Sequence, residues 1–231
     1  MVTLNELVYD LWEIARPRIS DDDNFDKRQF RFWIKNTRAR LLRNELNKNR
    51  TIDSNIIQDL GCVPLELADK ADCCEITDGC KILRTSKEIP NTIELYNKSA
   101  ITRVAPINKL EVPFNFVEYE RAVFSGNGRF NSNQVFAFPL NNRIYIKIKD
   151  SNIAKFLTHI NVMGVFEDPE EASKFKHCDG TACYTDNSKY PVNNWMIETM
   201  KEMILSVNLN AALQAVEDTS NNAKADNNES V

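Results

Sequence analysis

The most constraining feature of this 231-residue chain is that its hydrophobic pattern changes period twice along the sequence. Apolar residues recur every three or four positions over residues 3–16, 24–47 and 193–216, which is the period of an amphipathic helix. Between about 63 and 166 the chain is instead rich in Val, Ile, Phe, Tyr and Thr with turn-forming breaks, which is typical of strands. The pattern predicts an α+β fold with N-terminal helices, a central, mostly antiparallel β-unit and a C-terminal helix.

These changes divide the chain into four expected parts: a helical region over 1–62, a β domain over 63–167, a C-terminal helical region over 168–216 and a polar tail over 217–231. A chain of this length buries a core large enough to fold without metal ions or disulfides. No apolar run of the sequence approaches the roughly 20 residues that span a bilayer, so we expect no membrane partner.

Local signals predict where several elements begin and end. Thr3 and Glu6 have the spacing of a capping box, and Gly61 suits the end of a short third helix near 54–60. Asn141-Asn142 predicts a hairpin turn, and Asp168-Pro169 predicts the start of a short helix. The candidate strands are TIELY (92–96), ITRVAPI (101–107), KLEVPFNFVEYERAVF (109–124), QVFAFPL (134–140), RIYIKIK (143–149) and FLTHINVMGVF (156–166).

Three of the six cysteines lie within residues 73–80, which raises the question of a metal site or a disulfide framework. Structural zinc sites favour two C-x₂₋₄-C pairs, whereas the spacings here are C-x₁₀-C-C-x₅-C and H-C-x₄-C. The N-terminal segment does not resemble a signal peptide, so we expect a cytosolic chain whose thiols stay reduced. We therefore predict no metal and no cofactor; the alternative is a zinc site built from His177, Cys178, Cys183 and one earlier cysteine.

Motifs that carry chemistry are missing from the sequence. It contains no nucleophile elbow, zinc-protease, Walker or kinase signature. The G-x-G within residues 125–130 precedes a strand-like run rather than the helix that a phosphate site requires. The acidic run at 21–26 lacks the glycine and glutamate of a calcium-binding loop, and we expect it to cap a helix. We predict that the protein is not an enzyme.

Positive charge is concentrated in one predicted helix. Residues 27–50 contain nine Lys and Arg against one acid, although the formal net charge of the whole chain is −4. Three interpretations stay open: protein–protein contact with an acidic face on another copy of the chain, contact with nucleic-acid phosphates, or a solvated face. The candidate contact residues are Arg28, Arg31, Lys35, Arg38 and Arg43.

The C-terminal helix offers a second candidate contact surface. Met196, Met200, Met203 and Val207 follow helical spacing, and Trp195 adds a large side chain at the start of the helix. Methionine-rich helices serve at adaptable interfaces, while packing against the chain's own β-unit is the alternative. We include Trp195, Met196 and Met200 among the candidate interface residues.

Five stretches carry a resemblance to a known family: LVYDLWEIARPRISDDDNFDKRQFRFWIKNTRARLLRNELNK, IIQDLGCVPLELADKADC, RTSKEIP, ITRVAPI and GVFEDPEEA. Together they resemble virion structural proteins of crAss-like, short-tailed bacteriophages of gut Bacteroidales, over most of residues 1–175. The family has no invariant catalytic motif to carry over to this chain.

The resemblance implies a head-to-tail connector or tail ring subunit that oligomerises around the DNA channel, with twelve copies expected. It implies docking to the portal protein, to other tail ring proteins or to both, and non-specific contact with genomic DNA. It also implies a location in the virion, at the tail or portal vertex, after assembly in the host cytoplasm. The alternative function is a nucleic-acid-binding module that uses the basic helix 27–50.

Overall fold

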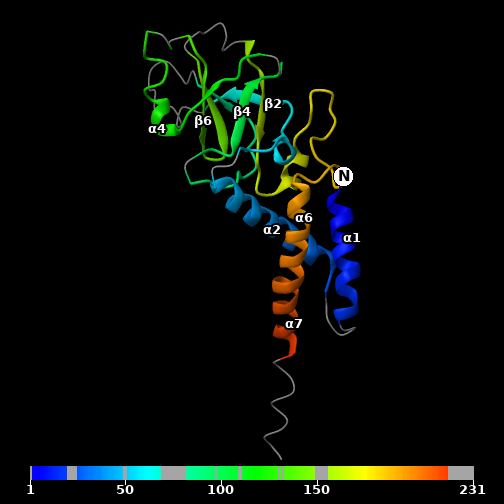
Figure 1. Ribbon diagram of the computed structural model, residues 1–231. Coiled ribbons are helices and arrows are strands. Elements are labelled where there is room, and N and C mark those ends of the chain that lie inside the picture. The colour runs from blue at the N-terminus through cyan, green and yellow to red at the C-terminus, as the bar shows by residue number, and fades with distance from the viewer. Residues whose placement is uncertain are drawn as a thin grey trace, which may run out of the picture. The chain divides into compact units, whose positions relative to one another are not determined.

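The computed structural model describes residues 2–19, 25–48, 51–68, 82–96, 98–108, 111–129, 131, 133–148 and 156–217. The chain forms two compact units, one of residues Met1–Asn55 with Asp186–Val231 and one of residues Ile56–Thr185. The first unit is helical and the second contains the sheet (Figure 1). Helices at both ends around a central sheet confirm the predicted α+β class.

The helical unit begins with α1 (Leu4–Ala15), whose first turn is closed by the predicted capping box. The Thr3 hydroxyl oxygen accepts from the Glu6 amide at 3.2 Å, and the Glu6 carboxylate accepts from the Thr3 amide at 2.8 Å. Pro17 lies in the 3₁₀ turn η1 (Arg16–Arg18) that ends this helix, because proline cannot donate the next helical hydrogen bond. The second predicted helix is α2 (Lys27–Asn47).

A long C-terminal helical run completes this unit. It consists of α6 (Asn194–Met203), a π-helical stretch η4 (Ile204–Leu209) and α7 (Asn210–Glu217), which confirms the predicted helix over 193–216. Helix α2 packs against both α1 and α6. The core of the unit draws on all three helices: Leu4, Leu7, Leu11, Phe30, Ile34, Leu42, Met196, Met200 and Ile204 are buried.

The second unit is a curled, mixed sheet. Its strands are β1 (Gln58–Asp59), β2 (Val63–Leu67), β3 (Leu83–Thr85), β4 (Ile101–Pro106), β5 (Asn115–Phe116), β6 (Phe136–Leu140), β7 (Arg143–Lys147) and β8 (His159–Gly164). Strand β8 pairs with β1, β2 and β4, and the order then runs from β2 through β3, β7 and β6 to β5. Among the described pairings only β5–β6 is parallel.

The β6–β7 hairpin forms as predicted. Asn141 and Asn142 have φ angles of 50° and 56°, the left-handed pair that a type I′ turn requires. Asp168 also caps a short helix, the 3₁₀ helix η3 (Pro169–Lys174), because its carboxylate accepts from the Glu170 amide at 2.9 Å.

Three sequence predictions for this unit are wrong. Residues 54–60 form only the 3₁₀ turn η2 (Ser54–Ile56), followed by β1, and not a third helix. The segment 92–96 contributes a single bridge from Thr92 to Phe166, and 109–124 contains the two-residue strand β5 and the short helix α4 (Tyr119–Ala122). Short apolar runs have no distinctive period, so partners distant in the sequence decide their structure.

Some predictions fall on parts of the chain that are not described. Residues 21–24 of the acidic run lie outside the described residues. Cys73, Cys74, Cys80 and the polar tail from 218 onward lie outside them as well. Asp26 is described; it occupies the N-cap position of α2 and makes no side-chain cap hydrogen bond.

Candidate assembly surface

Helix α2 divides its cations between the core and the surface. Its apolar face buries Phe30, Trp33 and Ile34, and the residues that recur on the opposite face are exposed. We call this exposed face, formed by Arg28, Phe32, Asn36, Arg40 and Arg43, the α2 stripe. The Arg28 side chain is 93% exposed and Phe32 is 60% exposed. A large aromatic side chain therefore lies in the middle of a basic helical surface.

Arg38 belongs to the core and not to that surface. It is fully buried, its Nε donates to the Pro191 carbonyl at 2.8 Å, and its guanidinium carbon lies 5.7 Å from the centroid of the Tyr190 ring. The expectation that Arg38 contacts a partner is thus replaced by a role inside the unit. Its position holds the segment that precedes α6 against α2.

Arg31 and Lys35 are half-buried, and Arg31 is also used within the unit. The Arg31 guanidinium lies 2.6 Å from the Asp186 carboxylate, and both side chains are about one-third exposed. Asp186 starts the same segment that Arg38 holds through Pro191. Of the five predicted basic contact residues, Arg28 and Arg43 are exposed.

Helix α6 also has an inner and an outer face. Met196 and Met200 are buried, which corrects the expectation that they form a contact surface; the helix that carries them packs against α2 of the helical unit. Trp195 remains 55% exposed. Glu198 and Glu202 follow it at helical spacing and are exposed as well. We call Trp195, Glu198 and Glu202 the α6 stripe.

One lysine on α6 is turned toward α1. The Lys201 ammonium lies 2.6 Å from the Asp10 carboxylate and 3.4 Å from Glu198. The hydrogen bond that Lys201 donates to the Asp10 carboxylate raises the pKa of Lys201 above its usual value, so the ammonium is charged at neutral pH. Because this lysine is largely covered, the outer surface of α6 is left acidic.

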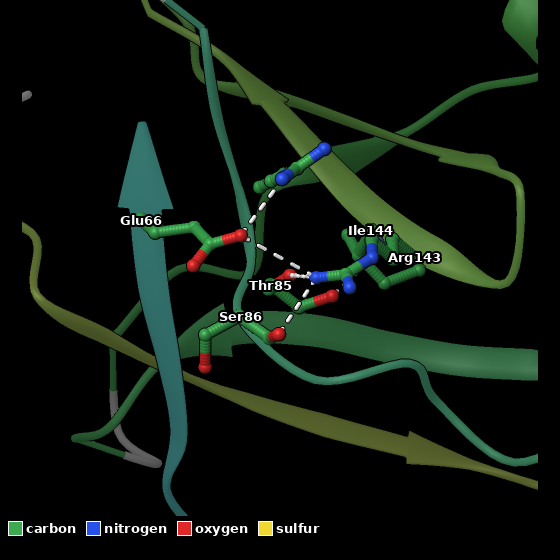
Figure 2. Close-up of polar contacts among 6 residues, drawn as sticks. Glu66, Thr85, Ser86, Arg143 and Ile144 are labelled. Atoms are coloured by element: carbon green, nitrogen blue, oxygen red, sulfur yellow. Dashed lines mark hydrogen bonds and ion pairs between the residues drawn. The ribbon is translucent and has the colours of Figure 1, made fainter. Parts of the chain in front are cut away.

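In the sheet unit, a polar network joins β2, β3 and β7. Figure 2 shows Glu66 directed toward Arg143, whose Nη1 lies 3.5 Å from a Glu66 carboxylate oxygen. The same nitrogen donates to the carbonyls of Thr85 and Ser86, each at 2.7 Å, and Glu66 also accepts from Arg84 at 2.9 Å. The Arg143 contacts drawn here satisfy strand carbonyls and a carboxylate, which is an architectural arrangement rather than a nucleophile with its base.

The cysteine prediction needs a correction at one pair. Cys62 and Cys178 form a disulfide with Cα atoms 5.2 Å apart, although they are 116 positions apart in the sequence. A backbone hydrogen bond also joins the two segments: the Cys62 amide donates to the Lys176 carbonyl at 3.0 Å. The expectation that this pair stays reduced and unbridged is therefore wrong in the structure.

The disulfide lines a surface groove of about 470 Å³ that also contains His159 and His177. Bridged cysteines supply no thiolate to a metal or to a reaction. Among the residues that the structure describes, there is no group of three or more His, Cys, Asp or Glu side chains arranged to hold a metal ion. Within the same residues, no helix is both long and apolar enough to cross a membrane.

Sequence reasoning missed five members of the two stripes: Phe32, Asn36, Arg40, Glu198 and Glu202. Each is exposed on a helix whose apolar period was recognised. The available signal was the complementary period of the outer face, where a phenylalanine and a tryptophan occur among charged residues.

A basic and an acidic helical face, each with an exposed aromatic residue, are features of a protein that assembles with other chains. The family model of phage tail ring protein 2 matches residues 6–228, nearly the whole chain. The chain therefore belongs to this family of crAss-like phage tail ring proteins, which confirms the resemblance seen in the sequence. No curated protein matches it. The protein has a structural role in the phage tail and is associated with the virion.

Proposed function

We propose that this chain is a non-enzymatic head-to-tail connector subunit that closes into a ring around the DNA channel. Twelve copies form the ring, which docks portal-side proteins on one surface and distal tail proteins on the other. The subunits assemble in the host cytoplasm and occupy the portal vertex of the finished particle. The match to the tail ring family over residues 6–228 is the observation that carries this proposal.

The surfaces of the helical unit support self-assembly. A closed ring of identical subunits uses two different faces of each subunit, one of which meets the other face on the next copy. The α2 stripe is basic and the α6 stripe is acidic, so the unit presents two unlike faces.

The purified full chain tests this proposal, alone and mixed with the portal and neighbouring tail proteins of the same phage. We expect closed rings in electron-microscopy class averages and a mass of roughly 320 kDa, twelve times the 26.6 kDa chain. A chain that stays monomeric under both conditions refutes the ring. Particles assembled without this chain that still join head to tail refute the connector role.

The exposed arginines of α2 favour a second candidate function, contact with nucleic acid. Arg28 and Arg40 flank the exposed Phe32, which combines phosphate-binding charge with a surface for base stacking. Filter binding to single- and double-stranded DNA over a salt series tests it. Phosphate neutralisation requires affinity that falls steeply as salt rises, and a flat or absent response removes this candidate.

A further inference from the structure

We propose that the α2 stripe of one copy docks against the α6 stripe of the next copy, forming the repeated lateral contact of the ring. This inference rests on the proposed self-assembly and adds to it the two surfaces that meet. The occupant of each stripe is therefore a second copy of this chain.

The α2 stripe has the properties of a cationic docking surface. Arg28, Arg40 and Arg43 supply its charge, and its members include no acid. Asp26 lies 3.6 Å from Arg28, but both side chains are strongly exposed, so this pair contributes little. The single acid of α2, Glu45, lies off the stripe with 18% of its side chain exposed. The exposed face is therefore positive along about four helical turns.

The α6 stripe has the opposite character. The Glu198 side chain is 83% exposed, and Glu202 follows one turn later. Lys201, the basic residue between them, is only 20% exposed and lies 2.6 Å from Asp10 and 3.4 Å from Glu198, so it offsets part of the charge of Glu198 and leaves Glu202 as the second acid of the stripe. Trp195 lies at the start of the stripe with half of its surface exposed. Tryptophan and arginine are the residue types most enriched among energetically important interface residues.

The two stripes are also compatible in length. At 1.5 Å per residue, the α2 stripe extends about 22 Å between Arg28 and Arg43, and the α6 stripe about 10 Å between Trp195 and Glu202. The acidic stripe therefore fits within the basic one when the helices lie alongside each other. In that arrangement arginines face carboxylates, and Phe32 and Trp195 lose exposed apolar surface.

Charge also determines which surfaces meet. Two α2 stripes repel each other, as do two α6 stripes, so a symmetric contact between like faces is disfavoured. The remaining pairing joins unlike faces, and such heterologous contacts are the ones that close into rings.

Charge reversal with complementation tests the pairing in the full chain. We expect Arg28→Glu with Arg40→Glu to weaken self-association about 10-fold. These two arginines lie about 18 Å apart along α2, so one of them faces the Glu198–Glu202 pair and becomes a repelling carboxylate in the variant. Glu198→Lys with Glu202→Lys has the same expected effect. An equal mixture of the two variants restores alternating contacts, and rings form again.

Matched controls reverse charges elsewhere. Arg129→Glu and Glu88→Lys change exposed residues of the sheet unit, and we expect each to leave the ring unchanged. Sedimentation velocity at two ionic strengths provides the readout, because screening weakens a contact between exposed charges.

A photo-crosslinking amino acid at position 32 identifies the contacted surface directly. Mixing isotopically labelled and unlabelled chains separates links between copies from links within one copy. We expect links between copies that reach peptides containing residues 195–202.

The outcomes separate the two proposals. Wild-type rings that resist both charge reversals, or links from position 32 to another surface, overturn the pairing and leave the ring intact. Loss of DNA binding without loss of the ring in the α2 variant assigns that stripe to nucleic acid and also overturns the pairing. A wild-type chain that never forms rings overturns the proposed function itself.

Discussion

Replacing Gly61 with alanine tests how closely the segment around residues 175–183 packs against the start of β2. Gly61 has a φ angle of +66°, in the left-handed region that disfavours a side chain. A Cβ atom placed there would lie 2.6 Å from the Lys176 carbonyl oxygen and 2.9 Å from both the His177 Cα and the Cys183 Sγ. Two of these three atoms belong to the backbone, so no side-chain rotation relieves the overlap.

The cost of Gly61→Ala has two parts. The left-handed conformation costs alanine about 1–2 kcal/mol relative to glycine. Moving the Lys176 carbonyl away also breaks its 3.0 Å hydrogen bond from the Cys62 amide, which adds about 1 kcal/mol. We expect a loss of about 2–3 kcal/mol in the free energy of unfolding, and a fall in melting temperature of about 4–12 °C.

Gly180→Ala is the matched control. Gly180 has a φ angle of +87°, but a Cβ atom there meets no heavy atom within 4 Å. Its alanine variant carries the conformational cost alone, about 1–2 kcal/mol. Urea denaturation followed by circular dichroism compares the two variants with the wild type. If Gly61→Ala loses no more stability than Gly180→Ala, the inferred close packing is refuted.

Three further substitutions test the roles assigned to buried and paired groups. Arg38→Leu leaves the Pro191 carbonyl without its donor and should lower the free energy of unfolding, measured by urea denaturation, by about 3 kcal/mol. Arg28→Leu should change it by less than about 0.5 kcal/mol. Equal effects of the two substitutions would contradict the division of α2 into core and surface. Asp10→Asn removes the group that raises the pKa of Lys201 and should cost about 1 kcal/mol at pH 7. Because the pKa of Lys201 is raised in the folded state, the stabilisation by the Lys201–Asp10 pair is complete below the unfolded-state pKa near 10.5 and is lost as pH rises through the folded-state pKa. A stability difference between wild type and Asp10→Asn that persists at higher pH would contradict the ion pair. A reductant should lower the melting temperature of the wild type but not of Cys62→Ser. The disulfide closes a loop of 116 positions, which stabilises the folded state by about 4–5 kcal/mol. Equal melting curves of the wild type with and without reductant would show that the bridge does not form.

The features that the sequence predicted correctly are local ones. The capping box at Thr3 and Glu6 and the hairpin turn at Asn141-Asn142 depend on residues within four positions of each other. The amphipathic period of α2 was also recognised over six turns, long enough to distinguish a helix from a strand. Family membership was recognised in the same way, from stretches of consecutive residues.

The basic helix shows what the local sequence did not predict correctly, namely which of its arginines are buried. The sequence predicted that Arg28 and Arg38 serve one contact surface, because both belong to a single charged segment. The structure buries Arg38 beneath Tyr190 and Pro191 and leaves Arg28 exposed. The helical period places Arg38 four residues from the buried Ile34 and Leu42, but the carbonyl and the ring that contact its guanidinium come from a segment more than 150 positions away.

Proximity between distant residues was decided by the tertiary structure alone. Strand β8 acquires three partners, β1, β2 and β4, and Cys178 reaches Cys62 across 116 positions. Local sequence determines which conformation a segment prefers, because the hydrogen bonds and steric limits involved lie within a few residues. Packing in three dimensions determines which segments meet, and so it assigned Arg38 to the core and left Phe32 and Trp195 on the surface.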